Sequence, residues 1–150
     1  MRRTGMLLIL GMLMTASPAM AESGPVQLSL VTPIQIVPEE KGVSAFRFNL
    51  LYGRNTTVQY VDIGLVNHTT VDGSKGVQWG LVGMTGGWRG VQINAINVNQ
   101  NGLFEGLQWG AVDYSEDFEG LQLGWLNWTK NMNGLQFGFV NYTETMNGLQ

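Results

Sequence analysis

Gly106-Leu107-Gln108-Trp109-Gly110 is the stretch that decides the fold, because it returns along the chain at a constant interval. It returns as Gly120-Leu121-Gln122-Leu123-Gly124 and as Gly134-Leu135-Gln136-Phe137-Gly138, and a further copy begins at Gly148-Leu149-Gln150. The four start points, at positions 106, 120, 134 and 148, are evenly spaced. A fixed period of about 14 residues indicates a chain built from stacked, similar units. The sequence therefore predicts a repeat protein.

Weaker copies of the same unit precede these, so the repeat covers most of the chain. The earlier units start at Ala45, Tyr60, Gly76 and Gly90, and their spacing is slightly less regular. The extra residues fall in connectors rich in Gly, Asn, Ser and Thr, where insertions are tolerated best. We expect an N-terminal lead-in strand and turn over residues 22–42 and tandem β repeats over residues 43–150, the last of them incomplete at Gln150.

Each unit has the alternation of a β-strand. Leu121, Leu123 and Trp125 share one face of the unit that starts at Gly120, while glycine and glutamine share the other. If the apolar face is the interior one, Leu135→Ala should lower stability by about 2–5 kcal/mol. Gln136→Ala should then have the smaller effect, unless the amides are buried in a ladder. No segment shows a helical period, so the sequence predicts an all-β fold.

Two architectures fit a strand-and-turn unit of this length. In a β-solenoid each unit is one coil, whereas in an antiparallel β-meander each unit is one strand of a sheet that could close into an outer-membrane barrel. A membrane-spanning strand needs roughly 9–11 residues and an apolar band about 25 Å tall. The apolar run from Leu121 to Trp125 covers only about 13 Å at ~3.3 Å per residue. We therefore favour the solenoid and keep the barrel-forming meander as the alternative.

The recurrence of identical polar residues also favours the solenoid. Side-chain amides that lie over one another in successive coils can form hydrogen-bonded ladders, which explains why the same residue type returns at one place in each unit. One such row is predicted at Gln78, Gln92, Gln108, Gln122, Gln136 and Gln150, a second at Asn67, Asn97, Asp113, Asn127 and Asn141, and a connector row at Phe118, Met132 and Met146.

The N-terminus has the features of a secretory signal peptide over residues 1–21. Arg2 and Arg3 precede an apolar stretch at residues 7–14, which is too short to span a bilayer, and Ala19-Met20-Ala21 has the small-residue pattern of a cleavage site. We expect cleavage before Glu22 and export through the inner membrane of a bacterium. Removal of two of the eight basic residues leaves 6 against 11 acidic ones, a net charge of about −5, which gives no electrostatic basis for nucleic-acid binding.

In its repeat units, such as the one that starts at Gly120, the chain resembles a family of exported bacterial surface-repeat proteins. That family is built from tandem Gly-Leu-Gln-x-Gly-apolar-apolar-Asn units. The segments 33–35 and 46–55 also resemble the N-terminal region of that family, and the similarity covers residues 26–150. The resemblance implies a location in the bacterial envelope, at the outer membrane or the cell surface. It carries no catalytic motif.

Candidate sites are few, and none predicts catalysis. The chain has no cysteine and a single histidine, which excludes thiol catalysis and a multi-histidine metal site. We interpret His68 as a connector histidine exposed to water. An acidic connector could in principle hold a hard cation, but it matches no calcium loop, so we interpret it as a solvated turn and predict no metal or other cofactor. It consists of Asp113, Glu116, Asp117 and Glu119.

The most specific candidate is a row of aromatic residues. Tyr114, Trp128 and Tyr142 each follow the row-forming Asp or Asn, so stacking would align them as a platform for a sugar or a peptide. Neighbouring aromatic side chains also stabilise strands simply by packing. Both interpretations remain open from the sequence.

These observations favour a non-enzymatic, exported envelope repeat protein with a structural or interaction role. The alternatives are a small outer-membrane β-barrel and a carbohydrate- or peptide-binding module that uses the aromatic row. We expect an envelope or extracellular partner, with outer-membrane association as a further expectation. The last unit lacks any proline, lysine run or bulge that would blunt its edge, so we also expect self-association through the open C-terminal edge.

Overall fold

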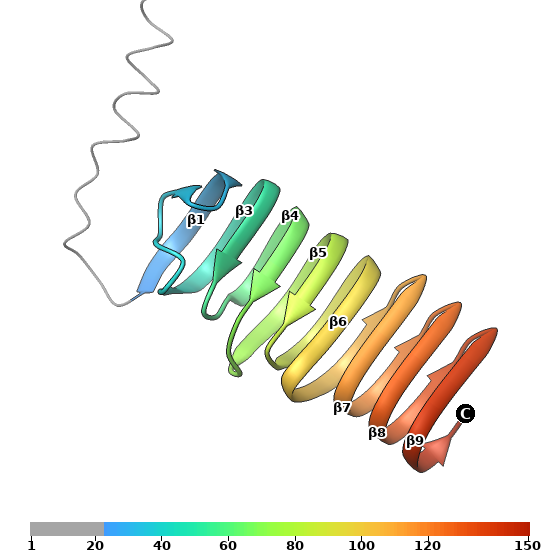
Figure 1. The fold of residues 1–150 in the computed structure, drawn as a ribbon. Helices are drawn as coiled ribbons and strands as arrows, with labels where there is room; N and C mark the ends of the chain where they lie inside the picture. The colour runs from blue at the N-terminus through green and yellow to red at the C-terminus, as the bar shows by residue number, and fades with distance from the viewer. Residues whose placement is uncertain (1–22) are drawn as a thin grey trace, which may run out of the picture.

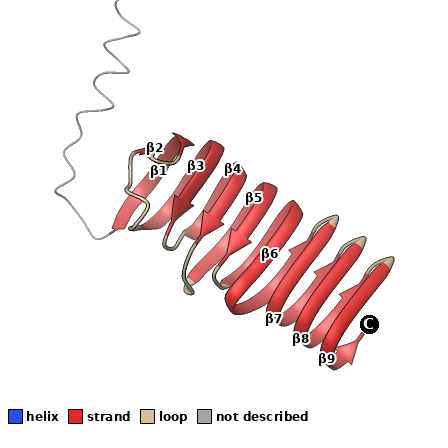
Figure 2. Ribbon diagram, in the orientation of Figure 1, coloured by secondary structure: helices blue, strands red, loops and turns tan. Residues whose placement is uncertain are grey.

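The computed structural model describes residues 23–150, and the predicted signal peptide lies outside them. Strands make up most of the described chain, and they wind into a narrow stack of coils (Figures 1 and 2). The strands are β1 (Ser23–Val31), β2 (Ile34–Gln35), β3 (Gly42–Asn55), β4 (Gln59–Thr69), β5 (Ser74–Thr85), β6 (Trp88–Trp109), β7 (Val112–Leu123), β8 (Leu126–Phe137) and β9 (Val140–Leu149).

Successive coils pair in parallel, which confirms the β-solenoid. The order is β2-β1-β3-β4-β5-β6-β7-β8-β9, and only the short β2 runs antiparallel to its neighbour. The antiparallel meander, our alternative, is therefore wrong. β1 pairs in parallel with β3, placing Val26 beside Phe46, so the stack already begins inside the segment interpreted as a lead-in.

The register places like residues over like, as the period predicts. Leu121 lies beside Leu135, and Gln122 beside Gln136. The unit that starts at Gly90 is longer than the regular ones. Its additional residues are accommodated in the connector between Asn99 and Leu103, where the register shifts and Asn101 takes a φ of 68°. The walls of the solenoid therefore keep a constant length while one turn absorbs the insertion.

Hydrogen bonds across the interior show that each coil is flattened into two facing walls. Thr129 Oγ1 donates to Gln122 Oε1 at 2.9 Å, and Gln136 Nε2 donates to Thr129 Oγ1 at 3.4 Å, each partner seven residues away along the chain. We call the segments that carry glutamine (120–123, 134–137) the first wall, and those that carry Asn and Thr (126–129, 140–143) the second wall.

The two walls are joined by two different turns. The apolar edge, formed by residues 110–111, 124–125 and 138–139, joins the first wall to the second within one coil. The polar edge, formed by residues 100–105, 116–119, 130–133 and 144–147, leads on to the next coil. Because partners across the interior are seven residues apart in both directions, these two edges lie on opposite sides of the coil.

The interior face is the glutamine face, and the apolar face is outside. Gln136 is fully buried, whereas Leu135 is 37% and Trp125 68% exposed. The interior orientation considered for Leu135 is therefore wrong. We now expect Gln136→Ala to lower stability more than Leu135→Ala does. Alternation shows which residues share a face but not which face is inside. Amides can occupy the interior because each one bonds to its equivalents in the coils above and below.

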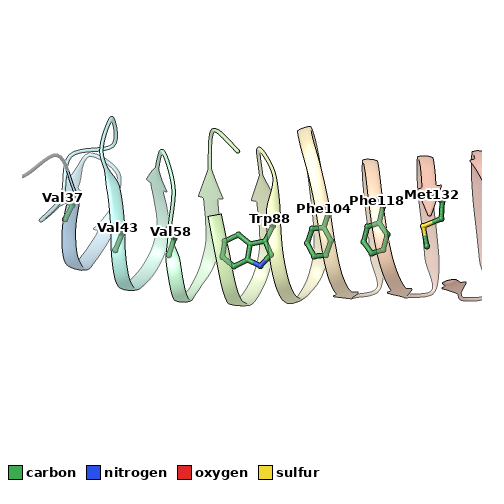
Figure 3. Packing of buried hydrophobic residues seen from close by; sticks show 7 residues of the cluster. All are labelled: Val37, Val43, Val58, Trp88, Phe104, Phe118 and Met132. Carbon is green, nitrogen blue, oxygen red and sulfur yellow. The ribbon is translucent and has the colours of Figure 1, made fainter. Parts of the chain in front are cut away.

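One apolar row does lie inside, behind the polar edge. Figure 3 shows its side chains following one another along the axis of the stack. Phe104 and Phe118 stack with ring centroids 5.0 Å apart and nearly parallel planes. The predicted connector row therefore forms the hydrophobic core, which consists of Val37, Val43, Val58, Trp88, Phe104, Phe118 and Met132, with Met146 packed against it.

Glycine has a steric role at both turns. Where the polar edge meets the first wall, Gly120 has a φ of +134°, a conformation that side chains disfavour, and equivalent glycines behave alike. At the apolar edge, a Cβ on Gly124 would lie 2.5 Å from Asn127 Oδ1. The Asn side chain therefore fits under the turn only because glycine occupies it.

Candidate functional site

The predicted aromatic row forms on the outer surface of the second wall. Tyr114 lies beside Trp128 and Trp128 beside Tyr142 in adjacent coils. The ring centroids are 6.3 and 5.3 Å apart, and both pairs meet edge to face at 75° and 73°. The structure thus brings the three residues together at the surface, two positions before the polar edge begins.

The ring geometry is that of aromatic side chains packing against one another. Edge-to-face contact is favourable because the positive edge of one ring meets the negative face of the next. Such rings do not form one flat platform, although Trp128 and Tyr142 remain about half exposed. Binding of a sugar or peptide by this row stays a prediction.

The acidic connector does not converge on one point. Asp113 lies inside the solenoid, whereas Glu116 accepts a hydrogen bond from Lys130 Nζ at 2.8 Å and Asp117 accepts one from Asn131 at 2.8 Å, both on the outer surface. The hydrogen bond with Lys130 lowers the pKa of Glu116, and the same contact raises the pKa of Lys130. Within residues 23–150, no three acidic or histidine side chains form a group that could hold a metal ion.

His68 is not the exposed connector residue that we expected. It lies in β4, half-buried, with Nδ1 2.9 Å from the hydroxyl of Tyr52. Burial lowers the pKa of His68, and the charges of Arg54 and Arg47 lower it further. The expectation was wrong because His68 is part of the second wall of its unit, and β4 continues to Thr69 before the connector begins. The neutral imidazole therefore has a structural contact.

The interior contains a buried ion pair that we did not predict. Arg47 and Asp62 are both inaccessible to solvent, and the guanidinium makes two hydrogen bonds of 2.7 Å to the carboxylate. Gln78 Nε2 donates to the same carboxylate at 2.8 Å. The register shows why the pair forms, because Arg47 and Asp62 occupy the glutamine position of adjacent units. An alignment of the weaker units with the regular ones would have shown two opposite charges at the glutamine position of adjacent coils.

The ion pair terminates a continuous ladder of amides. From Gln150 to Gln78, each Nε2 donates to the Oε1 of the preceding glutamine at 2.7 to 2.9 Å. All donors therefore point toward Asp62, whose negative charge they help to stabilise. Serine and threonine hydroxyls on the second wall donate to the same oxygens. The ladder consists of Gln78, Gln92, Gln108, Gln122, Gln136 and Gln150.

The asparagine row runs in the opposite direction and is interrupted at Asp113. Asn97 Nδ2 donates to Asp113 Oδ1 at 2.6 Å, and Asn127 Nδ2 donates to Asn141 Oδ1 at 2.7 Å. Between these pairs, Asp113 Oδ2 and Asn127 Oδ1 are buried without a hydrogen-bond partner. Both oxygens lie beside Gly124. Burial raises the pKa of Asp113 to about 7, against the effects of its hydrogen bonds with Asn97 and Gly110.

The outer surface of both walls is mainly apolar, and the exposed Arg54, which stands at the position of Tyr114 in an earlier coil, is a charged exception. Trp109 and Phe137 on the first wall are 55% and 50% exposed, and Phe139 at the apolar edge is 87% exposed. Further exposed apolar side chains lie at Phe48, Leu65, Trp79, Leu81, Ile96, Leu126 and Val140. An exposed apolar surface of this extent is uncommon on a monomeric soluble protein.

Comparison of the chain with protein-family models, with curated proteins and with solved structures gives no match. Within residues 23–150, no helix has the length and hydropathy needed to cross a membrane. The resemblance to exported surface-repeat proteins therefore remains an expectation, and the site must be interpreted from its own geometry.

Proposed function

We propose that this chain is a non-enzymatic repeat protein, exported to the envelope of a bacterium, where it serves a structural or interaction role. The observation that carries the proposal is the in-register stacking of equivalent side chains on the outer walls. Such stacking presents the same chemistry at regular intervals over a long surface. Repeat proteins use extended surfaces of this kind for contact with large partners.

The interior supports the same proposal. The charged and amide side chains in the interior bond mainly to one another, so they hold adjacent coils together. Asp62, for example, already accepts hydrogen bonds from Arg47 and Gln78. A carboxylate held in this way is not available as a general base for a substrate. The outer surface is therefore where a partner would bind.

Export is tested by producing the full chain in a Gram-negative host. We expect the intact mass of the protein recovered from the envelope to correspond to a chain that begins at Glu22. A control with Ala19→Leu and Ala21→Leu should remain unprocessed, because bulky residues are disfavoured at the cleavage site. Recovery of the unaltered chain from the cytoplasm with Arg2 still present would overturn the proposal.

A second candidate function is binding of a carbohydrate or peptide by Tyr114, Trp128 and Tyr142. The alignment of three partly exposed rings on adjacent coils favours it. Glycan and peptide arrays would test it, with Trp128→Ala as the site variant and Trp109→Ala on the first wall as the matched control. Specific binding should be lost only with Trp128→Ala. Equal binding by both variants would exclude the row as the site.

A further inference from the structure

The distribution of charge along the stack is sharply divided. From Gly90 to Gln150, the only charged side chain on the walls is Asp113, which points inward. The other charged residues all lie on the polar edge, at Glu105, Glu116, Asp117, Glu119, Lys130 and Glu144. The first wall, the apolar edge and the second wall therefore form one uncharged surface that wraps around the coil.

Between Gly90 and Gln150 the stack is thus polar inside and apolar outside, except along one edge. This is the arrangement expected where the surroundings are hydrocarbon and the protein satisfies its polar groups internally. Backbone groups of the walls are paired between adjacent parallel strands, as that environment requires, except along the outer edge of β9, the last strand of the sheet. A water-exposed surface would instead carry charge on the walls as well as on the edge.

We propose that the apolar edge and both walls insert into the hydrocarbon of a single bilayer leaflet, with the polar edge at the headgroups. The inference rests on the proposed envelope function and names its partner, a lipid surface. The apolar surface has a suitable height, because the first wall from Gly120 to Leu123 covers about 10 Å at ~3.3 Å per residue and the turn at 124–125 adds the apolar edge to it. One leaflet has about 15 Å of hydrocarbon, half of the ~30 Å core.

The aromatic row lies where such an insertion would need it. Tyr114, Trp128 and Tyr142 border the polar edge, two positions before Glu116, Lys130 and Glu144. Tyr and Trp prefer the boundary between hydrocarbon and headgroups, because one end of each side chain is apolar and the other forms hydrogen bonds. In this arrangement the row anchors the depth of the solenoid in the membrane.

A second copy of the chain fits the surface less well than lipid does. A partner packed on one wall would leave the opposite wall and Trp125 uncovered, since the apolar surface continues around the edge. Protein interfaces also carry polar groups at the rim, whereas the outer faces of both walls carry no charge between Gly90 and Gln150. Lipid hydrocarbon covers both walls and the edge at once and requires no matching shape.

The polar edge predicts which lipids are needed. Five of its six charged residues between Gly90 and Gln150 are acidic and one is basic. An acidic edge gains nothing from anionic headgroups, so binding should depend on burial of apolar surface rather than on lipid charge. We expect the processed full chain to float with neutral phosphatidylcholine vesicles, and to do so equally at low and high salt.

Two matched variants test the orientation of the protein in the bilayer. Phe139→Asp places a charge on the apolar edge at a side chain with few packing contacts, and Asn133→Asp places the same charge on the polar edge. Phe139→Asp should weaken vesicle binding at least tenfold, and Asn133→Asp should leave it unchanged. Circular dichroism serves to confirm that both variants keep the fold.

Spin labels measure the depth of each edge in the bilayer. The chain has no cysteine of its own, so a single introduced cysteine takes the only label. A label at Phe139→Cys should be accessible to oxygen and shielded from a water-soluble relaxation agent, and a label at Asn133→Cys should show the reverse. An envelope-located chain that stays in buffer with vesicles would overturn the leaflet insertion and leave the proposed function standing. Concentration-dependent dimers that Phe139→Asp disrupts, without vesicle binding, would assign the surface to a second copy. Vesicle binding by a chain that is not exported would instead overturn the proposed function.

Discussion

Asp113→Asn should stabilise the protein at neutral and alkaline pH. Both neighbours of Asp113 in its row, Asn97 and Asn127, are asparagines, and the carboxylate leaves Asn127 Oδ1 without a donor. Asparagine at position 113 would keep the acceptor for Asn97 and supply an Nδ2 donor toward Asn127. The substitution therefore completes a ladder in which donors point toward the C-terminus.

The size of the effect follows from the raised pKa of Asp113, about 7 against an ordinary value of 3.8. A group whose pKa is raised by folding contributes most stability below its unfolded pKa and loses that contribution as pH rises through the folded pKa. Between pH 5 and pH 8, Asp113 should therefore lower the free energy of unfolding by roughly 2.5 kcal/mol. At pH 5 the protonated carboxyl can itself donate to Asn127, so the variant should gain little there.

Urea denaturation at pH 5 and pH 8 measures this difference. The gain in stability of Asp113→Asn over the unaltered protein should be small at pH 5 and roughly 2.5 kcal/mol larger at pH 8. Glu119→Gln is the matched control, because it removes an exposed carboxylate from the same connector and should change little at either pH. A gain that is the same at both pH values, or a loss at pH 8, would refute the reasoning.

Four further variants test other parts of the fold, each by denaturation. Asp62→Asn should lower stability by about 3–5 kcal/mol, because it leaves Arg47 charged and unpaired. The double variant Arg47→Gln with Asp62→Gln should restore near-normal stability, because it extends the amide ladder. A double variant as unstable as the single one would contradict this. Phe118→Ala should cost about 3–5 kcal/mol, and a cost below about 1 kcal/mol would mean that the row of Figure 3 is not the core. Gly120→Ala should prevent stable folding, because its Cβ would collide with the backbone of Gly106; a variant of normal stability would place the turn elsewhere.

The period and the residue types predict the stacking but not the side that faces inward. Gln108, Gln122 and Gln136 could be aligned from the sequence, since a coil of constant length places them over one another. Their burial depends on the small distance between the walls, which lets Thr129 reach Gln122, and that distance is a property of the closed coil. A rule that puts leucine inside and glutamine outside therefore fails in a stack whose amides satisfy one another.

The candidate site, too, could be predicted only in part from the sequence. Tyr114, Trp128 and Tyr142 were aligned correctly, because their position in the unit is constant. The ion pair of Arg47 and Asp62 was missed because those units are degenerate, although both residues stand at the glutamine position. The raised pKa of Asp113 could not be predicted, since it depends on burial among neighbours from adjacent coils.

Cysteine labelling along one strand is the most direct test of a solenoid whose glutamine face is inside and whose leucine face is outside. Leu135→Cys, Gln136→Cys and Phe137→Cys place single thiols at consecutive positions of β8, in a chain with no other cysteine. With a water-soluble maleimide, and in the absence of lipid, positions 135 and 137 should react rapidly, and position 136 should react only after unfolding in urea. Rapid reaction at 136 with protection at 135 and 137, in variants that keep their β-sheet circular dichroism, would place the leucine face inside and contradict the account.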